Sequence, residues 1–517
     1  MADLRLSGMS GIPFGESSGR PSNADLGQPY FNATQRRLEL FTANGWQNIV
    51  SETPSVTGVT GSYLESNSTN TLTIIGTSFS EGCVASAIGT NGVSVEADST
   101  TVNSAIELSA VFSGLSSQYE PYDIRVTNLS NLYGQINNTL YINETPTWST
   151  AAGNLATVSY GQPISLQVSA TDPEETSIVY SSSNLPAFLS LNASTGALTG
   201  TGTKVSSSTT YSFSVTASDG ANSTSRTFNV IVSPSVYVQA LLVAGGGGGG
   251  GWVGAGGGGG GIVYSTGTAV TIGSQKTVEV GAGGNRTSAY TGGYVAGTNG
   301  GNSTFNSLVA LGGGVGGTYT GSVYIGGTSG GSGGGGSEVQ PSGSEVGGTG
   351  LQPSSASGGY GNNGGTSTAG GGGSGGGGAG AVGGSSSNGN GGVGGAGLNT
   401  WATWATATSS GASGYFAGGG GGGSDNSAGA GGVGGGGAGT KANDGQATSG
   451  TANTGGGGGG GRNSGGPAAN QGGAGGSGIV IIRYPDTLED PTQYTGTKYT
   501  SGGYKYFKFT TNGTITF

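Results

Sequence analysis

Uninterrupted glycine runs dominate the second half of this sequence. Glycine supplies 120 of the 517 residues, and most of it lies between residues 234 and 485. A glycine has no side chain to bury, and it loses more backbone freedom on ordering than any other residue. The runs are Gly245–Gly251, Gly256–Gly261, Gly333–Gly336, Gly370–Gly373, Gly375–Gly378, Gly418–Gly423, Gly434–Gly437 and Gly455–Gly461. Such a region must either remain a flexible linker or be ordered by its backbone hydrogen bonds.

Two structures compete for this region. Glycine-rich chains ordinarily behave as random coil. Alternatively, the runs pack side by side as extended helices with three residues per turn, which form lateral hydrogen bonds because they make none internally. Apolar residues such as Trp252 and Val315 interrupt the runs, strands bracket them, and the region is longer than a structureless stretch in a compact protein. We therefore predict an ordered polyglycine II bundle.

The rest of the chain carries the alternation of apolar and polar residues that is typical of β-strands. Examples are residues 71–76, 122–128 and 211–217, each followed by turn residues. The predicted fold class is all-β and multidomain, with two Ig-like β-sandwiches followed by a glycine-rich β/polyglycine II domain. The predicted boundaries are 1–52, 53–144, 145–233, 234–485 and 486–517. We expect the last segment to pair with the strands that bound the glycine-rich region.

The composition argues against several classes of function. No histidine occurs and Cys83 is the single cysteine, which excludes a Ser–His–Asp triad, histidine metal sites and an intrachain disulfide. We predict no enzyme activity and no cofactor. The net charge of −10 is spread without a basic run, and no stretch of apolar residues is long enough to span a bilayer. We therefore expect neither nucleic acid as a partner nor insertion into a membrane.

Three acidic residues could together hold a calcium ion. Asp172, Glu174 and Asp219 lie in turn-rich segments of the 145–233 module, and oxygen-rich clusters suit this ion. Roles in turns or on the surface are the alternative, and they fit these residue types better. No other metal site is predicted.

The N-terminal segment resembles one that recurs in structural proteins of marine tailed phages, especially cyanophages. The resemblance rests on Gly27 followed by Tyr30-Phe31-Asn32, on Leu38-Glu39-Leu40 and on Gly45-Trp46. It implies a module for virion attachment or trimerisation at residues 1–52. A small β-hairpin cap is the alternative. The chain also lacks the basic-then-apolar start of a signal peptide.

Two further segments resemble Ig-like modules. The order Thr73–Phe79, then Tyr122–Asn128, resembles the Ig-like fold shared by plexins and transcription factors. Residues 185–201, together with the TASDG stretch at 216–220, resemble Ig/cadherin-like modules. Both resemblances imply β-sandwich spacers.

The glycine-rich segment resembles the glycine-rich domains of phage tail fibres and host-range adhesins. The resemblance rests on residues 241–244 leading into the first glycine run and on residues 477–484, which close the region. A similar domain occurs in some receptor tyrosine kinase ectodomains. The resemblance implies host-receptor recognition through loops on a rigid glycine core.

Together, these resemblances predict a virion fibre or adhesin, assembled in the host cytoplasm and released by lysis. The expected partners are other virion proteins through the N-terminus and a host surface glycan or outer-membrane protein. The expected assembly is a homotrimer. A capsid or tail decoration fibre with weakly glycan-binding Ig modules and a polysaccharide-degrading tailspike are the alternatives.

Aromatic residues that interrupt the glycine runs are the candidate receptor contacts. Aromatic rings stack on sugars and anchor interfaces at low entropic cost, and rigid scaffolds present binding residues on loops. Alternatively, these rings fill a small core or the seam of a trimer. The candidates are Trp401, Trp404, Tyr415, Phe416, Tyr290, Tyr294, Tyr319, Tyr324 and Tyr360.

Overall fold

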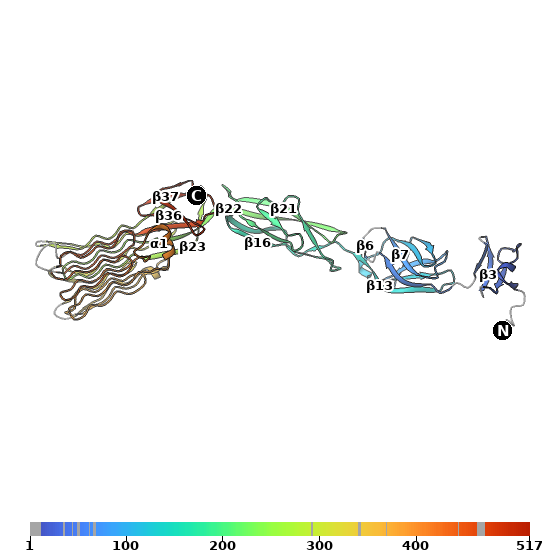
Figure 1. The fold of residues 1–517 in the computed structure, drawn as a ribbon, viewed down its shortest axis with the longest axis horizontal. Helices are drawn as coiled ribbons and strands as arrows, with labels where there is room; N and C mark the ends of the chain where they lie inside the picture. Colours follow the sequence, from blue (N-terminus) through green and yellow to red (C-terminus); the bar gives the residue numbers. More distant parts are fainter. Residues whose placement is uncertain are drawn as a thin grey trace. The chain divides into compact units, whose positions relative to one another are not determined.

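The protein is built almost entirely from β-strands and extended glycine rods (Figure 1). The computed structural model describes residues 12–34, 37–43, 45–48, 52–60, 63–65, 69–290, 293–339, 343–368, 370–442, 444–462 and 471–517. One compact unit comprises Met1–Leu155, Ser165–Gly200 and Ser212–Asn229, and the other comprises Ala156–Ile164, Thr201–Tyr211 and Val230–Phe517. The all-β, multidomain prediction is confirmed.

The N-terminal segment forms a four-stranded sheet in the order β1-β2-β3-β4, beside the short 3-10 helix η1 (Ser17–Gly19). Its strands are β1 (Phe14–Gly15), β2 (Pro29–Asn32), β3 (Arg37–Thr42) and β4 (Gly45–Asn48). The Glu39 side chain is buried and accepts two hydrogen bonds from Arg20, of 2.7 and 2.6 Å, and one from Asn32. The bonds from Arg20 lower the pKa of Glu39, so this ion pair fastens the segment before β2 to β3.

The next module is a β-sandwich. One sheet has the order β10-β11-β7-β5 and the other the order β6-β13-β12-β8-β9. In β7, Leu72 and Ile74 are fully buried between the sheets while their neighbours are partly exposed, and Ile124 and Val126 do the same in β12. The predicted alternation is therefore confirmed. The strands are β5 (Ser55–Thr60), β6 (Tyr63–Glu65), β7 (Asn70–Thr77), β8 (Val84–Ile88), β9 (Ser94–Glu96), β10 (Ser99–Ser104), β11 (Glu107–Phe112), β12 (Tyr122–Thr127) and β13 (Tyr133–Asn143), with the 3-10 helix η2 (Ser117–Tyr119).

Aromatic side chains form the core of the following module. Trp148 packs with its ring centroid 5.3 Å from that of Phe228 and 5.9 Å from that of Tyr180, and Phe213 lies beside Phe228. The strands are β14 (Thr147–Trp148), β15 (Gly153–Tyr160), β16 (Pro163–Gln167), β17 (Ala170–Thr171), β18 (Val179–Ser181), β19 (Leu189–Leu191), β20 (Ala197–Thr201), β21 (Thr209–Ser218) and β22 (Ser223–Val243).

Strand β22 crosses the predicted module boundary at residue 233 and continues through Pro234. Proline donates no backbone hydrogen bond, but the Pro234 carbonyl oxygen accepts one from the Ile272 amide at 2.8 Å. The strand therefore does not have to end there.

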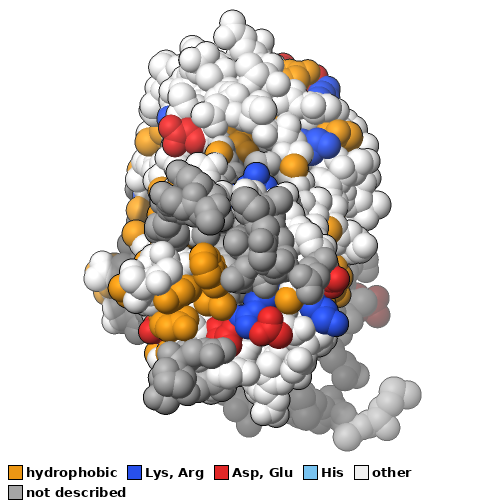
Figure 2. Space-filling model, turned by 90° about the vertical axis from the view of Figure 1, so that its left-hand side faces the viewer, with side chains coloured by type: hydrophobic (Ala, Val, Ile, Leu, Met, Phe, Trp, Pro, Cys, Tyr) orange, Lys and Arg blue, Asp and Glu red, His pale blue; other side chains and the backbone are white. Residues whose placement is uncertain are grey.

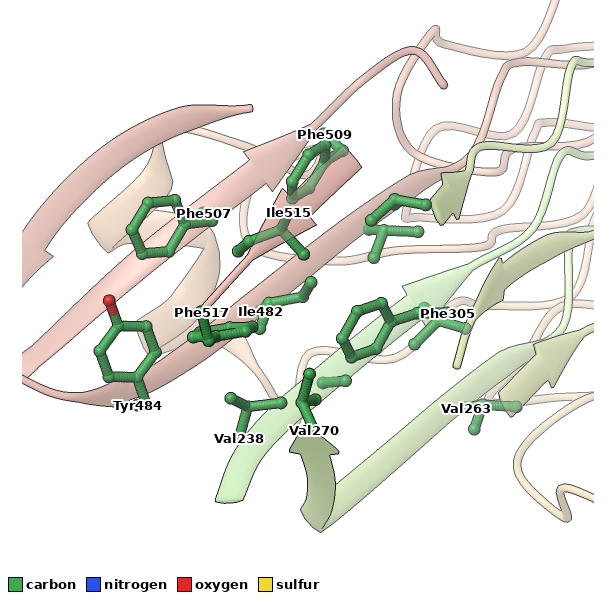
Figure 3. Close-up of a cluster of buried hydrophobic side chains, with 14 of the residues drawn as sticks. Val238, Val263, Val270, Phe305, Ile482, Tyr484, Phe507, Phe509, Ile515 and Phe517 are labelled. Carbon is green, nitrogen blue, oxygen red and sulfur yellow. The ribbon is translucent and has the colours of Figure 1, made fainter. Parts of the chain in front are cut away.

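Two further sheets enclose an apolar core (Figure 3). The C-terminal half of β22 pairs with β23 and β33, and the order continues to β36 and β35. The second sheet has the order β28-β27-β24-β37-β34. Phe507, Tyr484 and Phe517 fill the space between the sheets together with Phe305 from β27. The strands are β23 (Ile262–Thr271), β24 (Gln275–Glu279), β27 (Ser303–Phe305), β28 (Leu308–Ala310), β33 (Ile479–Pro485), β34 (Gln493–Tyr494), β35 (Thr497–Ser501), β36 (Tyr504–Phe509) and β37 (Gly513–Thr516).

The predicted pairing of the C-terminal tail is confirmed. Strand β36 pairs antiparallel with β33, which closes the glycine-rich region, and Ile482 lies opposite Phe507. Strand β37 pairs with β24. The tail therefore completes both sheets of this sandwich.

The glycine runs form a lattice of rods, where a rod is an extended glycine-rich segment between two turns (Figure 1). In the first rod, successive amides donate to three different neighbouring rods in rotation. The pairs are Gly245 to Gly301, Gly246 to Gly476, Gly247 to Gly258, Gly248 to Thr298, Gly249 to Gly473 and Gly250 to Ala255, with N···O distances between 2.8 and 3.2 Å. A repeat of three residues with lateral bonds is the polyglycine II pattern. The ordered bundle is therefore confirmed.

Many positions in the inner rods leave room for glycine alone. A Cβ atom built on Gly247 would lie 2.1 Å from the carbonyl oxygen of Gly314, and one on Gly257 would lie 2.2 Å from that of Gly247. Cβ atoms in proteins essentially never come this close to another heavy atom. The hydrogen-bond lattice thus depends on the missing side chain, because any other residue would push the neighbouring rod away.

The rods have two ends. Only Ala244 separates Gly245 from β22, and Gly261 leads into β23, so the turn between these two rods lies away from the strands (Figure 1). We call the end beside the strands the strand end and the opposite end the loop end. The loop-end turns include residues 251–254, 318–325, 385–390 and 424–428. The short elements there are β25 (Ser288–Tyr290), β26 (Gly293–Val295), β29 (Thr318–Tyr319), β30 (Tyr324–Ile325), β31 (Ser344–Glu345) and β32 (Ser367–Thr368), whereas η3 (Gln352–Ser354) and α1 (Ala402–Thr408) lie at the strand end.

Candidate functional site

The lattice separates the candidate aromatic residues into two groups, one at each end. The segment 398–416 lies at the strand end, where α1 packs against β35 and β36. Trp401, Trp404 and Phe416 have only 4%, 2% and 0% of their surface exposed. They share a core with Ile479 and Ile481 of β33.

The prediction that these three side chains contact a receptor is therefore wrong. The alternative interpretation holds: Trp401, Trp404 and Phe416 fill a core, which we call the core plug. The physical reason is that β33 is apolar on both faces. Its Ile482 faces the sandwich core, so its Ile481 needs a second cover, which α1 supplies. The Arg483 guanidinium lies 4.3 Å from the Trp404 ring centroid and closes the edge of this cluster.

Tyr360 and Tyr415 also lie at the strand end. Tyr360 is 45% exposed and meets Trp401 edge-on at 5.7 Å between ring centroids, while its backbone bridges to Ile262. Tyr415 is half-buried and bridges to Ala412. These residues therefore flank the core plug rather than the loops.

The second group lies at the loop end. Tyr319 and Tyr324 face each other across the β29–β30 hairpin, and their rings stack at 4.5 Å between centroids with an interplanar angle of 29°. Trp252 approaches Tyr319 edge-on at 5.8 Å. All three rings are half-buried. Trp252, Tyr319 and Tyr324 are the loop-end aromatic cluster. Tyr290 and Tyr294 belong to β25 and β26, but their side chains lie outside the described residues.

Buried polar contacts fasten this hairpin to the lattice. The Thr318 hydroxyl is buried and donates to the carbonyl oxygen of Gly251 at 2.8 Å, beside Trp252. The adjacent Val253 forms a β-bridge with Arg462. The Arg462 guanidinium is buried and bonds to the carboxylates of Glu338 and Asp425. Because these contacts link five separate segments of the chain, the aromatic cluster lies on a fixed surface.

Figure 2 shows the face of the molecule at this end, where an apolar patch adjoins a group of acidic and basic side chains. Val323 is 57% exposed and Ile325 is 40% exposed, both in the same hairpin as Tyr319 and Tyr324. Arg462 is neutralised by its two carboxylates, and burial alone would lower its pKa whereas those bonds raise it. The loop end therefore offers exposed apolar and aromatic surface beside internally paired charges.

Trp252 is not among the receptor contacts predicted from the sequence. Its signal is a tryptophan in the turn between the two longest early glycine runs, at a backbone φ of +64°. Residues other than glycine are uncommon in this left-handed region. The aromatic density of 398–416 misled the prediction because side-chain type alone does not tell which end of a rod a turn occupies.

The calcium candidates serve in turns. The Asp172 carboxylate accepts hydrogen bonds from the Glu174 and Thr176 amides, and Asp219 accepts bonds from the Ala221 and Asn222 amides. Among the residues that the structure describes, no group of three or more acidic or cysteine side chains is placed to hold a metal ion. Asp172 and Asp219 therefore act in turns, which is the role that the sequence analysis favours for these residue types. Within the same described ranges, no helix is both long and apolar enough to cross a membrane.

Two carboxyls of the first unit predict a pH dependence of stability. Burial raises the pKa of Glu120 and of Glu174 above the ordinary value of 4.5. Between the ordinary pKa and the raised pKa, the native state therefore binds protons more readily than the unfolded state. The free energy of unfolding then falls as the pH rises through the raised pKa. We expect the melting temperature of the first unit to increase as the pH is lowered from neutral towards 4.5. Thermal unfolding followed across this pH range checks it.

Glu174→Gln is the matched variant for this pH effect. Its amide oxygen can still accept the Glu144 amide hydrogen bond of 2.9 Å, without a buried charge. We expect this variant to melt at a higher temperature at neutral pH and to depend less on pH. Melting that is independent of pH in the unmodified protein would contradict the expectation. The lowered pKa of Glu39 acts in the opposite direction only below 4.5.

Comparisons with known proteins agree with this architecture. The family model for a glycine-rich domain matches residues 222–485, which is just over half of the 517-residue chain. The family model for an Ig domain matches residues 146–233. A search of curated proteins finds no match.

Solved structures are similar only at a low level. A two-Ig-domain fragment of DIP-gamma is 12% identical and covers 36% of this chain and 99% of its own, with a TM-score of 0.24. An I-band fragment of titin is 9% identical and covers 50% and 87%, with a TM-score of 0.25. The N-terminal Ig module of the Drosophila receptor protein tyrosine phosphatase DLAR is 11% identical and covers 35% and 100%, with a TM-score of 0.15. No argument rests on likenesses this weak. The match over residues 222–485 is decisive, and the chain belongs to the glycine-rich domain family.

Proposed function

We propose that this protein is a non-enzymatic virion fibre or adhesin that binds the surface of a bacterial host through the loop end of its glycine lattice. Ig-like and glycine-rich domains together fit an adhesin-type or structural role. The observation that carries the proposal is the lattice itself, which holds the turns 251–254 and 318–325 at one end on rods that have no freedom to slide. The resemblance of residues 1–52 to phage structural proteins supports attachment to a virion through the N-terminus.

The division of labour along the chain supports the same proposal. Most residues that face neighbouring rods are glycines, with a few small residues such as Ser374 between them, so larger side chains are accommodated in the turns and in the outward positions of the outer rods. Rigid scaffolds with variable loops are a common solution for binding surfaces. Host surface glycans or outer-membrane proteins are the proposed partners, other virion proteins are the proposed neighbours, and a homotrimer is the proposed assembly.

Binding of the fluorescently labelled full chain to cells tests the proposal. The panel consists of marine cyanobacterial strains together with other bacteria from the same waters. We expect saturable binding to at least one strain. We also expect at least tenfold weaker binding when residues 319–324 are replaced by glycine, because this removes two of the three rings.

Val393→Ala is the matched control, because Val393 is 57% exposed on a rod rather than in a loop-end turn. This variant should bind as the unmodified chain does. Absence of binding to every strain would overturn the proposal. Binding that survives the loop replacement would also overturn it, and would instead favour recognition through the Ig-like modules.

A further inference from the structure

We propose that the loop-end aromatic cluster, Trp252 with Tyr319 and Tyr324, is a stacking site for an uncharged sugar ring of a surface glycan. This inference rests on the proposed function and names the chemistry of its ligand. It is carried by the backbone of Trp252, by the arrangement of the three rings and by the charges around them.

The backbone of Trp252 indicates that its side chain is needed at this position. Its φ of +64° lies in the left-handed region, which glycine adopts freely and other residues adopt at a cost. Gly251 precedes it and a glycine run begins four residues later, so glycine in the turn would fit the local sequence as well. Retained backbone strain of this kind is characteristic of functional sites.

The three rings form a compact apolar platform with a polar rim. Tyr319 and Tyr324 are nearly parallel at 4.5 Å, and Trp252 stands almost perpendicular to Tyr319, at an angle of 78°. The Thr320 and Ser322 hydroxyls lie in the exposed turn of the same hairpin, 3.4 Å apart. A pyranose ring offers an apolar C–H face and a ring of hydroxyl groups, and such ligands suit aromatic surfaces that carry a few placed polar groups.

The charges at the loop end favour an uncharged ring over an acidic one. The Arg462 guanidinium, which could otherwise attract a carboxylate ligand, already binds Glu338 and Asp425. A carboxylate oxygen of Glu345 lies 3.1 Å from the Cβ position built on Gly326, immediately after the hairpin. The net charge of the chain is −10. Sialic and uronic acids therefore find no free guanidinium from Arg462 and meet the Glu345 carboxylate beside the hairpin.

The sugar site has to be distinguished from a purely structural role of Trp252. Trp252→Gly removes the indole and relieves the left-handed strain at once. If the indole serves the ligand, this variant should melt at an unchanged or higher temperature and bind at least tenfold more weakly. If the indole only supports Tyr319, the variant should melt at a lower temperature and keep its glycan affinity, which would overturn the inference.

The experiment measures binding of the full chain to an array of immobilised oligosaccharides. Half of the array carries neutral terminal residues (glucose, galactose, N-acetylglucosamine and rhamnose), and the other half carries sialic or glucuronic acid. Trp252→Gly and Tyr324→Ala are compared with Trp252→Phe, which keeps a ring, and with Tyr360→Ala, which removes a 45% exposed tyrosine at the strand end. We expect binding to neutral termini only. The affinity should fall at least tenfold in Trp252→Gly and Tyr324→Ala, and it should be unchanged in Trp252→Phe and Tyr360→Ala.

The outcomes separate this inference from the proposed function. Equal binding to acidic and neutral termini, or equal binding by all four variants, would overturn the sugar site. If the chain binds cells but no glycan, and Trp252→Gly binds those cells normally, the adhesin proposal stands and the sugar site fails. If the chain binds neither cells nor glycans, both fail.

Discussion

Replacing Gly247 by alanine is expected to destabilise the glycine-rich unit by more than about 3 kcal/mol. The new Cβ atom would lie 2.1 Å from the carbonyl oxygen of Gly314 and 2.5 Å from its carbonyl carbon. The neighbouring rod would have to move, and the bonds from Gly247 to Gly258 and from Gly258 to Gly314, both 2.8 Å, would be lost with it. Thermal or denaturant unfolding of the full chain measures the loss.

Gly267→Ala is the matched control for this effect. Gly267 lies in β23 of the same unit, and a Cβ atom there would meet only Tyr237 at an ordinary contact distance of 3.5 Å. The same chemical change should therefore be neutral or slightly stabilising, because it restricts the unfolded chain. Equal effects of the two substitutions would show that the rods are not packed as described.

Replacing Trp404 by alanine is expected to cost about 3–5 kcal/mol of stability, with no direct effect on a surface contact. The indole is 2% exposed and lies between Tyr264 and Tyr506, at 5.7 and 5.8 Å between ring centroids. Its removal leaves a cavity over β33 and takes away the ring that Arg483 covers. Denaturant unfolding gives the change in free energy.

Two controls separate packing from exposure in this cluster. Trp404→Phe keeps an aromatic ring and should lose clearly less stability than Trp404→Ala. Tyr360→Ala removes a neighbouring ring that is 45% exposed, and it should change the free energy of unfolding by less than about 1 kcal/mol. A Trp404→Ala variant that unfolds like the unmodified chain would contradict the core assignment.

Most strands were predictable from the sequence because each has one buried face. Leu72 and Ile74 in β7 alternate with polar neighbours, and the alternation alone identifies the strand. The strands β22 and β33 are covered on both faces, so their apolar residues are continuous and alternation gives no register. The 398–416 segment covers their second face. It is distant from both strands in the sequence, and no local pattern identifies it as their cover.

The sequence also indicates whether a rod is inner or outer. Inner rods such as Gly256–Gly261 are pure glycine, whereas the outer rod 391–397 reads Gly-Gly-Val-Gly-Gly-Ala-Gly. In it, Val393 is exposed and Ala396 is partly exposed, one turn of the threefold helix apart. A side chain at every third residue therefore marks an outer rod. Which end of a rod carries a given turn follows from counting rods onward from β22, and this would have placed Trp252 at the loop end and Trp404 at the strand end.

Hydrogen–deuterium exchange of the full chain tests the ordered lattice most directly. The amides of residues 245–250 all donate to neighbouring rods, so we predict that they exchange as slowly as the amides of β33. In the outer rod 391–397, five amides donate laterally, whereas those of Val393 and Ala396 have no acceptor in the described part of the chain and should exchange fast. This alternation within one rod is the predicted result. Complete exchange within seconds across all glycine runs, as in a random coil, would contradict the lattice and the platform that it provides.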